Sequence, residues 1–419
     1  MNDRRGYRMT EIGEIPDDWE IKTLDEITSQ FISGGTPSTS NPDYWNGEIP
    51  WMRSAWINKR FVDAGEKYIS EKGLKNSATN VVPCGSLLVA TRVCIGNVAL
   101  NNIDIAISQD LTGIVIRKEK AAPEYVYWAL KNLENRIKSL VQGSTIGGVL
   151  REDLRKLRIP IPLSVLEQQK IALVVSTVDD AILKTDEIIA KTQQLKKGLM
   201  QQLLTRGIGY TKFKQSEIGM IPEEWDLVRL GQIATIRYGL GQPPHQDENG
   251  IPMIRATNIE GGQILDEGML RIKRSAIPLS RDPFLKSGDI IIVRSGVYTG
   301  DIGLVTSKFE GAVAGYDLIV SPSEKADSVF LAHYLLSSRV QAHFFQLKFR
   351  AAQSHLNAQQ VSDTPIALPS CAEQKRIASI LSGVEEKHDK ENRRKVGLEQ
   401  MKKGLMQVLL TGKVRVKVG

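Results

Sequence analysis

The sequence predicts an α+β protein of mixed α/β content that arose by tandem duplication. Two globular domains are expected, joined by two long helices that form an antiparallel coiled coil. Three observations predict this fold class: the chain repeats at an offset of 206 residues, each repeat ends in about forty residues without proline, and those residues carry apolar side chains at heptad spacing. The expected arrangement is pseudo-two-fold symmetric and circular.

The repeat is visible in three separated segments that keep one register. The pattern E-I-G-x-I-P-x-x-W at Glu11–Trp19 returns at Glu217–Trp225. The other two matches are Glu167-Gln168 with Glu373-Gln374, and Lys196–Gln201 with Lys402–Gln407. Between these segments, residues 25–158 and 231–364 share only scattered similarities. The sequence therefore predicts a common frame that carries two different inserts.

Each insert mixes short strands with short helices. Gly85–Arg92 and Gly288–Arg294 are β-branched or aliphatic runs that begin with glycine, which is typical of buried strands. Glu124–Leu133 and Ser328–Ser337 have the apolar spacing of helices, and we expect their aromatic side chains to lie in the cores.

The end of each repeat is predicted to be one long helix. Leu166–Thr205 follows Pro162 and Ala372–Thr411 follows Pro369, and proline suits the region just before a helix. The predicted coiled-coil seam consists of Ile171, Val175, Val178, Ile182, Ile189, Leu199, Ile377, Leu381, Val384, Leu398 and Leu405. Each stripe could instead pack on its own domain, but the other helix is the surface of matching length and pattern.

These patterns set the expected domain boundaries. They are 1–162 for the first globular domain, 163–205 for the first long helix, 206–216 for a linker, 217–369 for the second globular domain, 370–411 for the second long helix and 412–419 for a C-terminal tail. Because the linker corresponds to the beginning of the chain, we expect the C-terminal tail to lie near the N-terminus.

The composition is that of a folded protein in a reducing compartment. Lys and Arg exceed Asp and Glu by 55 to 48, a mild positive excess that suits a polyanionic partner without establishing one. Three scattered cysteines cannot form a disulfide framework, and no stretch is apolar enough for a membrane span. We expect a cytoplasmic protein of a prokaryote.

No motif of enzyme chemistry is complete. The chain has no P-loop, no nucleophile elbow, and no histidine spacing that suits zinc. Asn41–Tyr44 resembles the N-P-P-Y motif of amino-methyltransferases, but its third residue is acidic and no glycine-rich cofactor loop accompanies it. The sequence therefore predicts no catalytic residue, no metal and no cofactor in this chain.

The inserts do contain hydrogen-bonding residues beside arginines and aromatics. Arginine and lysine suit guanine edges, asparagine suits adenine, and Ser, Thr and Lys hold phosphates. The candidate DNA-binding residues are Thr36, Ser38, Thr39, Arg53, Ser54, Lys59, Arg60, Arg92, Ser144, Thr145, Arg255, Thr257, Asn258, Arg271, Lys273, Arg274, Arg294, Tyr298 and Gln353. For each one, a surface charge or a local turn bond remains an alternative.

In combination, these motifs resemble the specificity (S) subunits of type I restriction-modification systems. The resemblance rests on the duplicated E-I-G-x-I-P-x-x-W, the Gly34–Ser38 loop with Tyr44–Gly47, the E-Q helix start and the K-K-G-L-M-Q helix end. It covers nearly the whole chain. The start of the second helix departs from the pattern, because Pro365–Pro369 lacks the paired prolines found at Pro160–Pro162.

The resemblance implies that the two globular domains are target recognition domains. Each would read one half of a split, asymmetric double-stranded DNA sequence, and the antiparallel coiled coil would set the distance between them. Two modification (methyltransferase) subunits would dock around the coil, and restriction (translocase and endonuclease) subunits would join them in antiviral defence. S-adenosylmethionine, ATP and Mg would be bound by these partners, and DNA-mimicking anti-restriction proteins are a further implied partner.

Two other hypotheses remain open on the sequence. One is a self-contained nuclease or methyltransferase with an unrecognised site. The other is a coiled-coil adaptor that binds only protein and does not read DNA directly.

Overall fold

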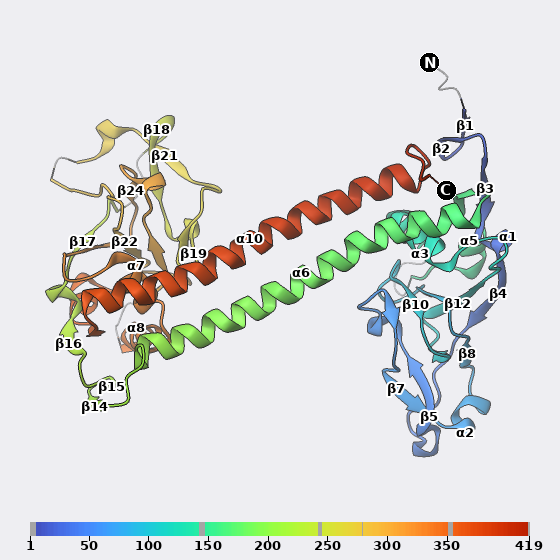
Figure 1. Ribbon diagram of the computed structural model, residues 1–419, viewed down its shortest axis with the longest axis horizontal. Helices are drawn as coiled ribbons and strands as arrows, with labels where there is room; N and C mark the ends of the chain where they lie inside the picture. Colours follow the sequence, from blue (N-terminus) through green and yellow to red (C-terminus); the bar gives the residue numbers. More distant parts are fainter. Residues whose placement is uncertain (1–5, 142–146, 242–244, 279, 351–354, 418–419) are drawn as a thin grey trace. The chain divides into compact units, whose positions relative to one another are not determined.

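The computed structural model describes residues 6–141, 147–241, 245–278, 280–350 and 355–417 (Figure 1). The chain forms two compact units. The first unit comprises Met1–Asp186 and Arg393–Gly419, and the second comprises Glu187–Asn392. The long helices are α6 (Val165–Arg206) and α10 (Cys371–Leu409). Each unit therefore holds one globular domain and one part of each long helix, and the predicted duplicated α+β fold is confirmed.

Two sheets build the domain of the first unit. The five-stranded sheet has the order β4 (Thr28–Ser33), β12 (Leu111–Ile116), β9 (Leu87–Ala90), β10 (Val98–Asn101) and β6 (Phe61–Val62). The four-stranded sheet has the order β7 (Lys67–Ile69), β5 (Trp45–Met52), β11 (Ile105–Ile107) and β8 (Asn80–Val82). All four residues of β9 are buried, as its aliphatic run predicts.

The second unit repeats this topology with fewer strands. Its four-stranded sheet has the order β17 (Ala234–Tyr238), β25 (Leu318–Pro322), β22 (Ile290–Ile292) and β23 (Ile302–Leu304). Its three-stranded sheet has the order β21 (Leu270–Ile272), β18 (Gln246–Ile254) and β24 (Val313–Ala314). Strand β22 lies between β25 and β23 as β9 lies between β12 and β10. The frame of the domain is therefore the same in both units.

Shorter elements complete each domain. In the first unit these are β1 (Tyr7–Thr10), β2 (Gly13–Pro16), β3 (Trp19–Thr23), β13 (Arg158–Pro162), α1 (Leu24–Ile27), η1 (Pro42–Tyr44), η2 (Ser54–Trp56), α2 (Glu71–Lys75), α3 (Pro123–Asn132), α4 (Glu134–Ser139) and α5 (Arg151–Arg155). In the second they are β14 (Phe213–Ser216), β15 (Gly219–Pro222), β16 (Asp226–Arg229), β26 (Pro365–Leu368), β19 (Ile259–Glu260), β20 (Gln263–Ile264), η3 (Leu230–Gln232), η4 (Ala256–Asn258), η5 (Arg274–Ala276), η6 (Ser307–Phe309), α7 (Ser328–Leu335), α8 (Ser338–Arg350) and α9 (Ala358–Ser362).

A buried glutamine fastens each long helix to its domain. The Gln168 side-chain oxygen accepts the N–H of Ala122 at 2.8 Å, and its amide nitrogen donates to the carbonyls of Lys120 and Pro162. Gln374 makes the same three bonds in the second unit, with the N–H of Asp327 and the carbonyls of Lys325 and Pro369. Both side chains are fully buried. These bonds explain why the glutamine of the E-Q motif occurs in both repeats.

The preceding glutamate, Glu167 or Glu373, forms hydrogen bonds with the chain segment that passes the start of its helix. In the second unit, Glu373 accepts hydrogen bonds from Trp225 Nε1, the Tyr210 hydroxyl and the Ile208 N–H. The hydrogen bond to the Glu373 carboxylate raises the pKa of Tyr210 to about 12. The linker therefore passes beside the start of the second long helix.

In the first unit, the C-terminal tail takes the place that the linker has in the second. Glu167 accepts two hydrogen bonds from the Arg415 guanidinium, which also donates to Asp18 at 2.7 Å. These bonds lower the pKa of Asp18. The Tyr7 hydroxyl donates to the Gly412 carbonyl at 3.0 Å. The two ends of the chain thus meet in one unit, as the circular arrangement predicts.

The two long helices run antiparallel and side by side in each unit (Figure 1). In the first unit, Asp179 pairs with Lys402 and Asp186 with Lys395, both at 2.7 Å. A step of seven residues along α6 thus matches a step of seven back along α10. The Lys196–Glu385 pair of the second unit, also at 2.7 Å, has the same register. The helices therefore pair as the heptads predict.

The predicted seam residues divide into two groups. Those near the helix ends pack into the domain cores: Ile171, Val175 and Leu405 in the first unit, and Leu199, Ile377 and Leu381 in the second. Toward the middle, Ile182 is buried, while Val178, Ile189, Val384 and Leu398 are only half-buried. Thr185 and Thr192 are buried there as well. The central seam is thus less apolar than the heptads predict. At the helix ends, the apolar stripes pack on their own domains, which is the alternative that the sequence left open.

Within the described residues, no helix carries an apolar stretch that could cross a bilayer. The same part of the chain holds no group of three His, Cys, Asp or Glu side chains that could bind a metal.

Replacing Gln374 by alanine should destabilise the second unit strongly. The N–H of Asp327 and the carbonyls of Lys325 and Pro369 would lose their bonds to a fully buried side chain, which costs about 3 kcal/mol of unfolding free energy. Urea unfolding followed by tryptophan fluorescence measures this. Gln202→Ala, an exposed glutamine of α6, is the control and should change little. Equal effects of the two variants would contradict the role of the glutamine.

Candidate nucleic-acid interface

Loops at equivalent strand ends form a polar surface in each unit. In the first unit, the N–H of Thr91 donates to the Asp110 carbonyl, and the Thr91 carbonyl accepts from Val149. In the second, the N–H of Arg294 donates to the Asp317 carboxylate, and the Arg294 carbonyl accepts from Leu356. The two loops that follow β9 and β22 are therefore held in the same way, although their side chains differ.

The surface of the first unit contains a polar hollow of about 510 Å³. Arg92 and Arg151 line it, together with Gln109 from the loop before β12. Gln109 accepts a hydrogen bond from the Thr36 hydroxyl at 2.6 Å, which joins the glycine-rich loop to this hollow. Two arginines beside hydroxyl and amide groups can contact both phosphates and base edges.

A second hollow of the first unit lies beside Trp45. It is lined by Thr39, Lys67 and Tyr68 among others. The Trp45 indole donates to the Ser38 carbonyl at 3.1 Å, and the Lys67 ammonium lies 5.3 Å from the centre of the Trp45 ring. The loop that carries Ser38 and Thr39 is therefore held against an aromatic side chain, with a lysine at its edge.

In the second unit, the corresponding surface is aromatic and cationic. The Arg294 guanidinium lies over the rings of Tyr238 and Tyr316, and both tyrosines are partly exposed. Tyr298, on the loop between β22 and β23, is also exposed. Beneath the arginine, burial raises the pKa of the Asp317 carboxyl to about 6.

Eleven of the candidate DNA-binding residues lie exposed on the domains. They are Thr36, Ser38, Thr39, Arg53, Lys59, Arg92, Thr257, Arg271, Lys273, Arg274 and Tyr298. Several are also bonded inside their domain: Arg53 pairs with Glu66, and Arg271 donates to the Gly250 carbonyl. Arg255, which is half-buried, donates to the Gly268 carbonyl at 2.9 Å. Ser144, Thr145 and Gln353 lie outside the described residues.

Three of the candidates, Ser54, Asn258 and Arg60, serve the structure of their own domain. Ser54 is fully buried, and its N–H and hydroxyl both donate to the Asp110 carboxylate. Asn258 is buried and caps η4, with its amide donating to the Glu267 carbonyl at 2.9 Å. Their polar groups are used within the fold, so we correct their assignment as DNA contacts.

Arg60 is also structural rather than a free surface cation. Its guanidinium pairs with Asp180 at 2.5 Å and with Asp179 at 3.4 Å, both on α6. It lies over Phe61 at 4.9 Å and over Trp128 at 6.0 Å, and its side chain is nearly buried. Arg60 thus fixes the first domain to its helix. A lone arginine in a sequence does not reveal such partners.

Sequence reasoning missed residues that carry no motif. Gln109 and Tyr316 each precede the equivalent aspartates Asp110 and Asp317, and Arg151 begins α5. The duplication could have found the first two, because they occupy the same place in both repeats. Their different identities are the signal of an insert-specific surface.

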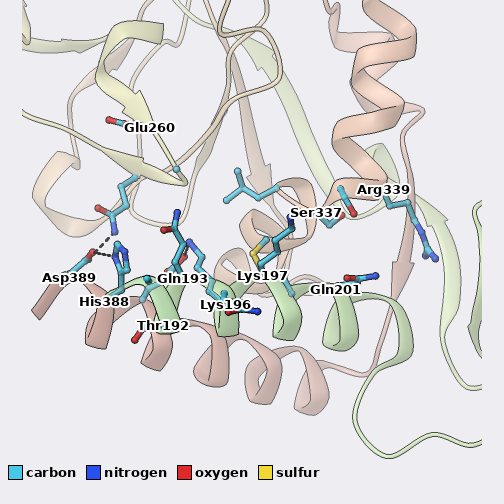
Figure 2. A pocket seen from close by; sticks show the side chains of 18 of the residues that line it. Thr192, Gln193, Lys196, Lys197, Gln201, Glu260, Ser337, Arg339, His388 and Asp389 are labelled. Carbon is cyan, nitrogen blue, oxygen red and sulfur yellow. Dashed lines mark hydrogen bonds and ion pairs between the residues drawn. The ribbon is translucent and has the colours of Figure 1, made fainter. Parts of the chain in front are cut away.

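The repeated K-K-G-L-M-Q segment lines a hollow in each unit. In the second unit this hollow measures about 950 Å³, with Lys197 and Gln201 of α6 on one side and Ser337 and Arg339 on the other (Figure 2). In the first unit a hollow of about 360 Å³ is lined by Lys403, Met406 and Gln407 of α10, with Lys131, Asn132 and Asn135 opposite. The same exposed lysine thus occupies the same place twice.

The buried Asp317 should make stability depend on pH. Because its pKa in the folded chain exceeds the ordinary 3.8, protonation favours the folded state, and this contribution is lost as pH rises from about 4 through 6. Asp317→Asn keeps an oxygen for the Arg294 N–H and removes the buried charge. The variant should gain up to about 3 kcal/mol over the wild type at pH 7, and little at pH 4.

Urea unfolding at several pH values measures this difference. Asp282→Asn, at an exposed position, is the control for the substitution itself. A stability difference for Asp317→Asn that stays constant between pH 4 and 7 would rule out the raised pKa.

Comparison with known proteins agrees with this duplicated architecture. The family described as "Type I restriction modification DNA specificity domain" matches residues 16–194 and again residues 222–400. The MjaVIII type I restriction enzyme specificity subunit of Methanocaldococcus jannaschii is 26% identical over 411 residues, covering 96% of this chain and 94% of that protein. The putative MjaX specificity subunit of the same organism is 29% identical, covering 98% and 97%.

Solved structures share the fold. The S subunit of a type I restriction-modification system from M. genitalium superposes with a TM-score of 0.63 at 14% identity, covering 100% of this chain and 99% of that one. A chain from a study of complex assembly and conformational transition in the type I R-M system gives 0.56 at 17% identity, covering 96% and 99%. The two family matches, one in each repeat, show that this chain belongs to the family of type I restriction-modification DNA specificity subunits.

Proposed function

We propose that this chain reads a bipartite, asymmetric DNA sequence, with each domain reading one half-site. The observation that carries this proposal is the common frame with different exposed side chains at equivalent positions: Gln109 in the first unit and Tyr316 in the second, each directly before the equivalent aspartate. Sequence is read by side chains that contact base edges. Two surfaces on one frame therefore read two different half-sites.

The helix pair would set the spacing between the half-sites. Helix α6 contains residues of both units and has 42 residues, which corresponds to about 60 Å at 1.5 Å per residue. The register of α6 on α10 is defined by the ion pairs of each unit. A fixed register is what a spacer of constant length requires.

Catalysis would come from partner subunits, and this chain would contribute recognition and assembly. The repeated hollows with Lys197 and Lys403 favour two copies of one partner, because both are lined by the same K-K-G-L-M-Q segment of a long helix. We assign that partner as the modification subunit, which would bind S-adenosylmethionine. The restriction subunits, with ATP and Mg, would join the same assembly.

Shortening both helices by one heptad should shorten the spacer and leave the half-sites unchanged. Deleting residues 183–189 and 392–398 removes the Asp186–Lys395 pair and keeps the heptad register. The loss of about 10 Å of helix corresponds to up to about three base pairs. Selection of bound duplexes from a library with every spacer length, using the complex with the modification subunit, measures the change. Deletion in α6 alone, the control, should impair assembly. Retention of the original spacer would contradict the proposal.

Charge reversal in the repeated hollows should remove the modification subunits one at a time. Lys197→Glu and Lys403→Glu should each weaken one docking site by about tenfold or more, and the double variant should weaken both. Native mass spectrometry counts the bound copies. Lys191→Glu, elsewhere on α6, is the matched control and should keep two copies. A double variant that still binds two copies at wild-type affinity would exclude these hollows.

A further inference from the structure

The most defined side-chain arrangement on the second unit is a guanidinium within 5 Å of the centres of two aromatic rings. The Arg294 guanidinium carbon lies 4.9 Å from the centre of the Tyr238 ring and 4.6 Å from that of the Tyr316 ring. The three residues come from the end of β17, the segment after β22 and the loop before β25. The tyrosines are 44% and 45% exposed, so the cluster lies at the surface.

This cluster is held in place before any ligand binds. The Tyr238 hydroxyl accepts the N–H of Ala358, at the start of α9, at 3.1 Å. The backbone N–H of Arg294 donates to the Asp317 carboxylate at 3.1 Å, and its carbonyl accepts from Leu356 at 2.9 Å. Because the ring and the backbone are fixed, little conformational entropy would be lost when the guanidinium binds.

The guanidinium donors are not used within the described part of the chain. No side-chain hydrogen bond or ion pair of Arg294 occurs among the described residues, and its Nε is buried without a partner there. The Tyr238 and Tyr316 rings both lie within 5 Å of the guanidinium carbon. An arginine edge suits a pair of acceptors in one plane, as the O6 and N7 atoms of guanine present in the major groove.

The duplication distinguishes a base contact from a phosphate contact. Phosphates are the same at both half-sites, so a phosphate-binding residue is expected in both units, whereas a base-reading residue should differ. At the place of Arg294, the first unit has Thr91, whose carbonyl accepts from Val149 as the Arg294 carbonyl accepts from Leu356. Tyr316 corresponds to Gln109, each directly before the equivalent aspartate. The whole cluster is therefore specific to the second unit.

We propose that Arg294, clamped by Tyr238 and Tyr316, reads a guanine in the half-site of the second unit. The guanidinium edge donates to O6 and N7 of that base, and the two tyrosines hold its plane. This inference rests on the proposed function and adds one base to it. It also predicts that the half-site read by the first unit does not depend on Arg294.

The first test maps methylated motifs in a host that lacks other N6-methyladenine and expresses this chain with its modification subunit. The wild type should give one bipartite motif. Arg294→Gln should relax one guanine position in one half-site, with the other half-site and the spacer unchanged. Arg294→Lys keeps the positive charge but lacks the paired N–H donors of the planar guanidinium, so it should also relax that position. A phosphate contact would instead leave Arg294→Lys like the wild type.

The matched control is Arg376→Gln. Arg376 is an exposed arginine of α10 in the same unit and is not among the candidate DNA-binding residues. Its replacement should leave the motif unchanged. The inference is wrong if the position relaxed by Arg294→Gln is not a G·C pair. It is also wrong if Arg294→Gln lowers methylation without changing the motif.

A second measurement covers the case in which the Arg294 variants lose methylation entirely. Each guanine of the half-sites is replaced in turn by 7-deazaguanine, which lacks the N7 acceptor, and binding of the wild-type complex is measured. Replacement of one guanine should weaken binding of the wild-type complex by about tenfold or more. The same replacement should not weaken binding of the Arg294→Lys complex. If no guanine is sensitive, the inference fails while the proposed function stands. A wild-type complex without a bipartite motif contradicts the proposed function and this inference together.

Discussion

The buried glutamine at the start of each long helix is the interaction on which the rest of the structure depends. Gln168 and Gln374 each use one side-chain oxygen and one amide nitrogen to bind three backbone groups of their domain. Removing such a group would leave buried donors and acceptors unpaired, which costs far more than a surface bond contributes. The direction in which each helix leaves its domain is thereby fixed, and the pairing of the two helices depends on that direction.

The duplication separates what the fold needs from what recognition needs. The tryptophans Trp19 and Trp225 are both fully buried, and the E-Q pair fastens both helices, so these residues are the same in both units. At the loops after β9 and β22 the backbone bonds are kept while the side chains change. The two repeats of one chain can thus be compared with each other. Residues that both repeats share support the structure or bind shared partners, and residues that differ determine specificity.

The sequence predicts the frame well, because repeats and heptads depend on many residues at once. Both long helices end within two residues of their expected bounds, and the aliphatic runs at β9 and β22 are buried strands. Single polar residues could not be assigned in the same way. Their roles depend on partners distant in the chain.

Arg60 and Ser54 show how distant partners decide the role of a single polar residue. The carboxylates of Asp179 and Asp180, more than a hundred residues away, bind Arg60, and Asp110 binds Ser54. No residue next to Arg60 or Ser54 in the sequence indicates these bonds. Tyr316 was missed for the opposite reason, since its importance comes from the guanidinium beside it and not from a motif.

The middle of the helix pair is polar, and this explains how it can define a length. Thr185 and Thr192 are buried at seam positions, and their hydroxyls donate to the carbonyls of Ala181 and Ile188 on their own helix. In the second unit, His388 and Asn392 of α10 are hydrogen-bonded to each other at 3.1 Å. Such a seam contributes less apolar contact than leucine would.

Register must then come from the charged residues that flank the seam. Each interhelical ion pair is partly exposed and contributes little to stability alone. A slip of one residue would nevertheless separate all of these pairs at once. An all-leucine seam would tolerate a slip of a whole heptad, because one leucine contact replaces another. The polar seam therefore favours a single register over maximal stability, and a single register is the property that a spacer between two half-sites demands.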